Sequence, residues 1–400
     1  MLATTMFIVV GFLLVILLVV LHEAGHFFAA RRNKIEVEEF GIGFPPRAKV
    51  LTKKNGTEYT LNWLPLGGFV KLKGEHDSDT EKGSYGAASL KGKVQVMLAG
   101  VVVNFFIAYL LFTIIALIGM PRLVPNQFTV ASDTNVIRQD VLVGFIAEDS
   151  PASKAEDPRL KGTENEIIRL EINDVINRVS LASCQDFEAS CSYEINEPDD
   201  LKDATQMLAR AEENAYVVLD ITRVDENYNL YTNLLTEDEV AASRETDEPK
   251  GYLGVVPNEF ALQRSTWSAP IVGAGITLQF TQLTLEGLWS IVSGLFQGDV
   301  DAATEQVAGF VGVGFIFANA TTFGFVFLLM IVAVISLSLA VMNTLPIPAL
   351  DGGRLFVTLL YRIRNKPLTK EIEEKIHGRG FVALLFLMLL ITIVDVQRFF

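Results

Sequence analysis

Four long apolar stretches limit what this chain can fold into more than any other feature of its sequence. Each approaches the roughly 20 apolar residues that cross the hydrocarbon core of a bilayer, whereas soluble domains do not collect their apolar residues in such runs. We therefore expect a polytopic α-helical membrane protein with about four transmembrane helices. The stretches are residues 6–21 with a continuation to residue 30, residues 94–120, residues 323–342 and the shorter run 380–394.

Charge is distributed unevenly along the chain, whose net charge is −14. Residues 121–270 hold 29 acidic and 13 basic side chains, which leaves the remainder nearly neutral. This balance excludes a nucleic-acid partner, because neutralising phosphates needs clustered Lys and Arg. The connections 31–93 and 354–379 carry 12 and 7 basic residues, and the positive-inside rule places both in the cytoplasm. The acidic segment and both termini are then expected on the extracytoplasmic side.

The only two cysteines, Cys184 and Cys191, both fall in this acidic segment. In an oxidising compartment they would close a small loop, which would add about 2 kcal/mol of stability. The alternative is a pair of free thiols in a surface insertion. The spacing alone leaves both interpretations open.

Three ionisable residues lie together inside the first apolar stretch, in the pattern His22-Glu23-Ala24-Gly25-His26. On a helix the two imidazoles are one turn apart on one face, so both reach a single Zn²⁺. Glu23 is placed to take a proton from water rather than to bind the metal. The alternative is that these are polar groups at the end of a helix, solvated at the interface. A carboxylate inside a span would then have no partner, which favours the metal site.

Zinc needs a third protein ligand, and the sequence indicates where it lies. The metzincin extension would require Gly and His at positions occupied by Ala29 and Arg32, so that class is excluded. After the third apolar stretch, residues 343–354 contain two prolines, two adjacent glycines and Asp351. Irregular backbone at membrane depth is tolerated where it is buried in protein or lines a wet cavity. A role of Asp351 as a metal ligand would explain why such backbone occurs here. An interfacial turn capped by the aspartate is the alternative.

Two motifs together, HEAGH at residues 22–26 and NTLPIPALDGG at residues 343–353, resemble the site-2 protease family of zinc intramembrane metalloproteases. The chain is most similar to the RseP-like bacterial branch, which carries an extracytoplasmic PDZ module between its second and third spans. The resemblance covers most of the chain. It implies a Zn²⁺ cofactor and a set of roles: His22, His26 and Asp351 as metal ligands, Glu23 as the catalytic base, and Asn343 as a residue that holds the substrate backbone.

Residues 41–73 alternate like strands around a glycine-rich turn and predict a small sheet. In the resembled family this is a membrane-associated, reentrant β element that pairs with an unwound substrate by strand addition. Gly67, Gly68 and Phe69 are then expected to contact the substrate. The alternative is a cytoplasmic hairpin with a structural role only.

The acidic segment resembles a single PDZ-like α/β domain. We expect strands at residues 143–147 and 216–223, a helix at residues 200–211, and a returning strand at residues 251–257. Asn165 and Glu166 stand where the family has Gly-Asp. Such a module would bind a peptide C-terminus or would filter substrates by the size of their external domains, and the sequence leaves both open.

These expectations divide the chain into four parts. Residues 1–120 form a membrane catalytic part, and residues 121–250 form the PDZ-like domain. Residues 251–322 form a linker and a membrane-associated segment, whose helix at residues 271–295 lies on the membrane or packs on the core instead of crossing. Residues 323–400 hold the third and fourth spans with the third metal ligand.

The combined interpretation is a zinc-dependent intramembrane endopeptidase in the inner membrane of a bacterium. By the resemblance, its partners are membrane lipid and single-span transmembrane substrates, such as anti-sigma-factor-like proteins or signal-peptide remnants. Two alternatives belong to other classes. A non-proteolytic scaffold presenting a PDZ module predicts that Glu23→Gln leaves function intact, and a transporter would need internal repeats, which the sequence does not show.

Overall fold

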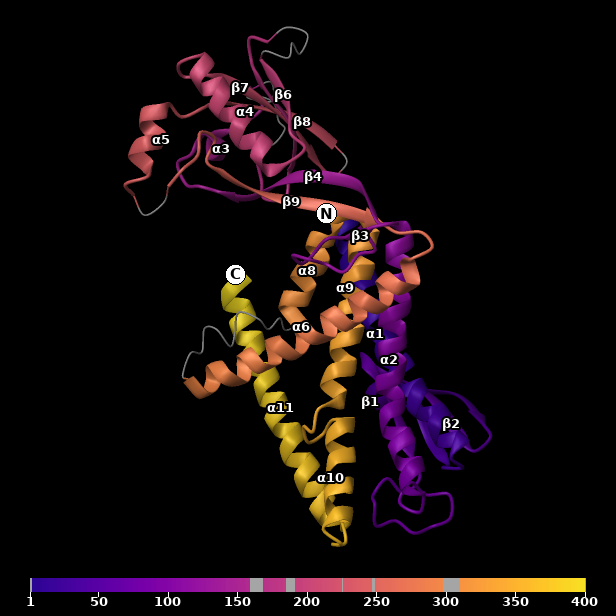
Figure 1. The fold of residues 1–400 in the computed structure, drawn as a ribbon. Coiled ribbons are helices and arrows are strands. Elements are labelled where there is room, and N and C mark those ends of the chain that lie inside the picture. The colour runs from indigo at the N-terminus through magenta and orange to yellow at the C-terminus, as the bar shows by residue number, and fades with distance from the viewer. Residues whose placement is uncertain are drawn as a thin grey trace. The chain divides into compact units, whose positions relative to one another are not determined.

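The computed structural model describes residues 2–158, 168–184, 191–224, 226–246, 249–297 and 310–399 (Figure 1). These residues belong to two compact units. The first comprises residues 1–118, 126–133 and 265–400, and the second comprises residues 119–125 and 134–264. The first unit therefore contains the apolar helices, and the second contains most of the acidic segment.

The described helices of the first unit include four that are long and apolar enough to cross a membrane, namely Thr4–Arg32, Leu90–Ile118, Phe325–Thr344 and Lys370–Val394. This number confirms the expected spans. The fourth helix is longer than the predicted run of residues 380–394, because the charged residues before that run continue the same helix. Lys370 and Glu374 form an ion pair one turn apart there. The helices are α1 (Leu2–Arg32), α2 (Leu90–Ile118), α6 (Ala269–Gln297), α8 (Phe310–Phe323), α9 (Phe325–Thr344), α10 (Asp351–Ile363) and α11 (Lys370–Phe399).

Helix α6 is not among the four candidate spans. It lies across α2 and α9 (Figure 1), and one of its faces buries Val272, Ile276 and Phe280. The Phe280 ring packs 5.8 Å from that of Phe112 on α2. This stripe at intervals of four residues explains why α6 packs on the core. Residues 298–309 of the predicted linker lie outside the described residues.

The chain between α9 and α10 is shaped by its prolines and by Ala349. Helix α9 ends at Thr344, since Pro346 and Pro348 have no N–H to continue the hydrogen-bond ladder. Ala349 adopts a left-handed backbone with φ +80°. Helix α10 then begins at Asp351, so that this carboxylate stands at the first position of a helix.

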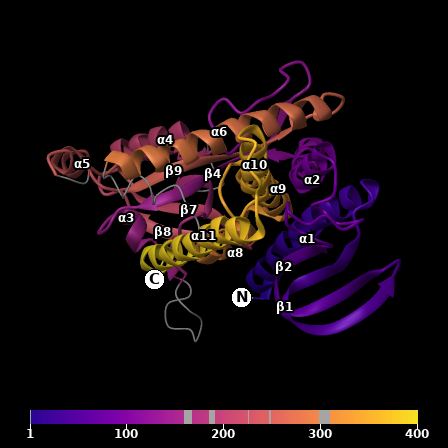
Figure 2. The ribbon, with the colours of Figure 1, turned by 90° about the horizontal axis from the view of Figure 1, so that it is seen from below.

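Strands β1 (Val37–Lys54) and β2 (Thr57–Leu72) form an antiparallel sheet beside α1, as Figure 1 and Figure 2 both show. Both strands bend, so residues 37–42 of β1 pair with residues 68–72 of β2 on one side and with residues 58–61 on the other. Residues 68–72 have a single partner run among the described strands, so they form an edge of the sheet.

The second unit is built on a sheet whose described strands number seven and follow the order β3-β9-β4-β5-β7-β8, with β6 paired to β5. Strand β7 coincides with the strand expected at residues 216–223. Strand β9 begins at Val255 and not at residue 251 as expected, because residues 251–254 form a bend. The sheet reaches Arg264, beyond the predicted domain end at residue 250, because β9 pairs along β4. The strands are β3 (Met120–Pro121), β4 (Asn135–Ile146), β5 (Val175–Leu181), β6 (Ser192–Glu194), β7 (Tyr216–Arg223), β8 (Glu226–Asn233) and β9 (Val255–Arg264).

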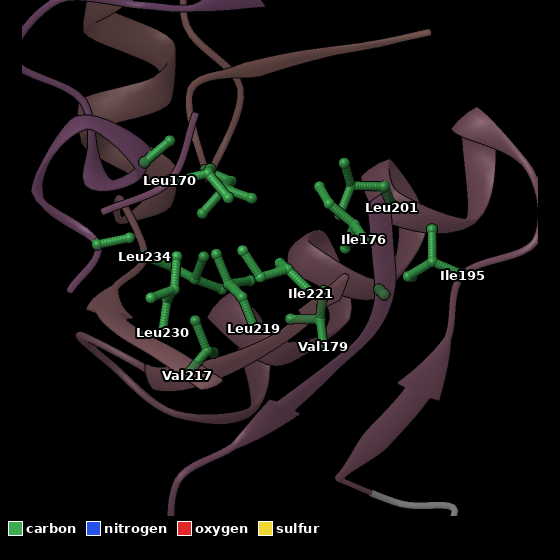
Figure 3. Packing of buried hydrophobic residues seen from close by; sticks show 14 of the residues in the cluster. Leu170, Ile176, Val179, Ile195, Leu201, Val217, Leu219, Ile221, Leu230 and Leu234 are labelled. Atoms are coloured by element: carbon green, nitrogen blue, oxygen red, sulfur yellow. The ribbon is translucent and has the colours of Figure 1, made fainter. Parts of the chain in front are cut away.

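Helix α4 (Pro198–Ala211) covers one face of this sheet and confirms the expected helix. It starts with a capping box between Glu197 and Asp200, and it buries Leu201 and Leu208 against the strands (Figure 3). The other described helices of the unit are α3 (Pro151–Lys154) and α5 (Glu237–Ser243). The sequence left open whether Cys184 and Cys191 are bonded to each other, and in the structure they form a disulfide.

Candidate active site

The site is assembled on α1, where His22 and His26 are one helical turn apart. Both imidazoles are buried, with about 7% of each residue exposed. Their Nε2 atoms lie 3.1 Å from one another. Two basic nitrogens so close together in an apolar helix are unfavourable unless a cation or a shared proton lies between them.

Asp351 brings a carboxylate to this pair from the far end of the chain. Its Oδ2 lies 3.1 Å from His22 Nε2 and 3.1 Å from His26 Nε2. The three atoms thus form a nearly equilateral triangle, and each corner is about 1.8 Å from its centre, slightly less than the roughly 2.0–2.2 Å of Zn–N and Zn–O bonds. These three atoms are therefore close enough together that they would hold a single zinc ion. Two histidines and one carboxylate are also a donor set that zinc hydrolases use.

Helix α2 forms the wall behind the three atoms. A Cβ added at Gly100 would lie 2.6 Å from both Nε2 atoms and 2.5 Å from His22 Cε1, so a side chain there would intrude on the metal position. One turn earlier, the carbonyl of Val96 accepts a 2.7 Å hydrogen bond from His26 Nδ1. This bond leaves the Nε2 lone pair of His26 free for a metal.

Glu23 lies between these ligands and the edge of the sheet. Its carboxylate accepts a hydrogen bond from the backbone N–H of Val70 in β2. A Cβ at Gly68 would lie 3.5 Å from Glu23 Cγ, an ordinary van der Waals distance, so the strand lies directly beside Glu23 of α1 at this point. The arrangement puts a proton acceptor beside both the ligand triangle and an unpaired strand edge.

The remaining predicted site residues have different positions. Gly67 and Gly68 are buried against α1, and Phe69 next to them is partly buried with its ring over Gly41. Asn343 lies in the last turn of α9, partly buried, and its side chain makes no hydrogen bond within the described part of the chain. Its contact with a substrate therefore stays a prediction.

Sequence reasoning missed two contributors to the site. The glycine at position 100 was visible only as one of several small residues, a pattern that plain helix packing also produces. The carbonyl of Val96 belongs to the backbone and leaves no trace in the residue type. Identifying either contributor requires knowing which face of α2 packs against α1.

Comparison with known proteins agrees with this geometry. The profile of peptidase family M50 matches residues 10–388. The chain is similar to the regulator of sigma-W protease RasP of Bacillus subtilis, with 28% identity over 96% of both chains. It is also similar to the regulator of sigma-E protease RseP of Salmonella typhimurium, with 24% identity over 95% of this chain and 96% of that one. A Fusobacterium nucleatum protein whose name assigns it as a zinc metalloprotease is 30% identical over 96% of both chains.

Proposed function

The chain belongs to peptidase family M50, the site-2 protease family, and on this premise we propose that it cleaves single-span proteins inside the membrane with Glu23 as the catalytic base. It is an integral membrane metalloendopeptidase, and its cofactor is zinc. The observation that carries the proposal is the convergence of His22, His26 and Asp351 on one point beside Glu23. These three residues hold the zinc.

The chemistry divides between the metal and the protein. When bound, zinc supplies a Lewis acid that polarises the peptide carbonyl and makes water acidic enough to attack at neutral pH. Glu23 takes a proton from the attacking water and returns it to the leaving amine, so one carboxylate acts as base and then as acid. The N–H of Val70 holds this carboxylate in place between the two proton transfers.

The β2 edge presents the substrate to this site. A transmembrane substrate is helical, and its backbone must be extended before water can reach a peptide bond. Residues 68–72 have no strand partner on the side beside Glu23. An extended segment can add there as a further strand once it replaces the contacts of the Val70 and Leu72 N–H groups with Glu23 and Glu75. Gly67, Gly68 and Phe69 then contact the substrate backbone, and Asn343 contacts it from the end of α9.

The second unit is assigned as a PDZ-like module on the extracytoplasmic side, where the two cysteines would be oxidised. Its sheet borders a groove of about 870 Å³ between α4 and residues 249–257. Residues 251–254 line that groove, and their N–H groups make no hydrogen bond within the described chain. Beyond them, one edge of β9 from Val255 to Glu259 has no strand partner among the described strands. Free N–H groups beside an open strand edge suit a peptide with a free terminal carboxylate, which favours peptide binding over pure size filtering.

The substrates we assign are single-span proteins of a bacterial inner membrane, either anti-sigma-factor-like proteins or signal-peptide remnants. Two relatives with sigma-factor regulation in their names motivate this class. The groove is tested on the full-length protein by comparing fluorescent peptides with a free and an amidated C-terminus. Equal affinity for the two peptides would show that no carboxylate is recognised there.

The catalytic assignment is tested by measuring two quantities on the same variants, the zinc content of the purified protein and the cleavage of a tagged single-span substrate. Glu23→Gln is expected to retain zinc and to lose cleavage, whereas Asp351→Ala is expected to lose both. Cleavage by Glu23→Gln at the wild-type rate would refute the base assignment. Full zinc content in Asp351→Ala would refute the ligand assignment.

A further inference from the structure

Helix α11 contacts the loop that carries the third metal ligand. The N–H of Ala349, two residues before Asp351, donates a 3.1 Å hydrogen bond to Nδ1 of His377. Ala349 is the residue with φ +80°, a conformation that is unfavourable for an alanine and persists only where the surroundings impose it. The hydrogen bond from α11 is such a constraint.

A second contact from the same helix face lies one turn further along. A Cβ added at Gly380 would lie 2.4 Å from Pro348 Cβ and 2.6 Å from the Pro348 carbonyl oxygen. The loop therefore packs directly on the α11 backbone at this position. His377 and Gly380 together restrain Pro348 and Ala349, which lie three and two residues before the ligand.

The same part of α11 is also anchored to the turn that follows β2, through Glu373, which lies one turn before His377. Glu373 is 4% exposed, and its carboxylate accepts a 3.0 Å hydrogen bond from the backbone N–H of Asp77. His76 lies 3.5 Å from Glu374 and 3.8 Å from Glu373. The first three turns of α11 are therefore held in place, whereas none of its most apolar window is buried in the protein.

We propose that His377 is a positioning residue of the zinc site, which acts through Ala349 to set the location of the Asp351 carboxylate. The fourth candidate span then has a role beyond anchoring, because its cytoplasmic end presses the metal-binding loop into a strained but productive shape. This inference rests on the proposed function of Asp351 as a ligand. His377 itself touches neither the ligands nor the substrate, so its effect appears first in zinc affinity.

The test measures the dissociation constant for zinc by competition with a chelator on purified full-length variants. His377→Ala is expected to weaken zinc binding about 10- to 100-fold, the range typical of residues that orient metal ligands. His377→Asn retains an acceptor near the position of Nδ1 and is expected to restore most of the affinity. Gly380→Ala pushes the loop from the same side and is expected to weaken zinc binding as well.

A matched control separates positioning from general docking of the helix. His76→Ala removes the contacts of His76 with Glu373 and Glu374. It leaves the hydrogen bonds of Glu373 with Asp77 and of His377 with Ala349 intact, so zinc affinity is expected to be unchanged. Equal losses in His76→Ala and His377→Ala would show that only helix docking matters and would overturn the inference. Wild-type affinity in His377→Ala would overturn it too. Neither outcome affects the ligand assignment, which is tested separately by Asp351→Ala.

Discussion

Replacing Gly100 by alanine is the most direct test of how the metal site is enclosed. The added Cβ would lie 2.6 Å from the Nε2 atoms of His22 and His26, about 1 Å closer than ordinary van der Waals contact. Both imidazoles must therefore turn away, or α2 must shift from α1. Overpacking of this kind costs about 1–3 kcal/mol of stability, and misdirected ligands cost roughly 10- to 100-fold in metal affinity.

The assay follows from these two magnitudes. Purified Gly100→Ala is expected to bind zinc at least about 10-fold more weakly than the wild type in chelator competition, with a parallel loss of substrate cleavage. Gly314→Ala in α8 is the matched control, because its Cβ would have no neighbour closer than 3.9 Å. That variant is expected to keep wild-type zinc affinity and gains helix propensity. Unchanged zinc affinity in Gly100→Ala would refute the inference that α2 encloses the metal site at this position.

Three further predictions address the remaining parts of the molecule. Burial opposes ionisation of Asp133, but hydrogen bonds from Thr266 and Ser268 outweigh it and hold the pKa of its carboxyl well below the usual value. Because the pKa of Asp133 is lower in the folded than in the unfolded protein, its ionised carboxylate stabilises the fold fully above about pH 4, and this stabilisation is lost as the pH falls further. Asp133→Asn should therefore lower the melting temperature at pH 7, and should lower it by a smaller amount at pH 3. Leu219→Ala, at a fully buried position of the second unit, should destabilise that unit by about 2–5 kcal/mol in denaturant unfolding; a smaller change would contradict the core assignment. Cys184→Ser should lower the stability of the same unit by about 2 kcal/mol, and an effect that persists in reducing buffer would argue against the disulfide as its cause.

The features that could be predicted from the sequence are those that repeat at a fixed local interval. Histidines four residues apart on a helix share a face whatever surrounds them, so the pair at His22 and His26 was visible at once. The spans followed from composition, and the helix at Pro198–Ala211 followed from its apolar positions three and four residues apart.

Features that depend on which surfaces meet were not visible. The run 37–42 pairs with strands on both sides, and nothing local to the sequence states that register. His377 is one of several polar residues in the first turns of α11, beside Glu373, Glu374 and Arg379, and nothing in that pattern singles it out. Its significance arises only where α11 meets Ala349, a contact between residues 28 positions apart.

The ligand set itself explains why the catalytic part spans both ends of the chain. In the proposed site, helix α1 supplies two ligands and the base. Catalytic zinc sites hold the metal with three protein ligands, and the third proposed ligand, Asp351, is 329 residues from His22. Zinc binding therefore stabilises the association of α1 with α10, and metal affinity reports how well the two ends are joined. The described residues between them contribute a wall at Gly100 and an edge at β2, but none of the three clustered ligand atoms. Zinc affinity must then depend on whether α1, α2 and α10 stay packed together, and a cut in the acidic segment that leaves this packing intact should leave the metal bound.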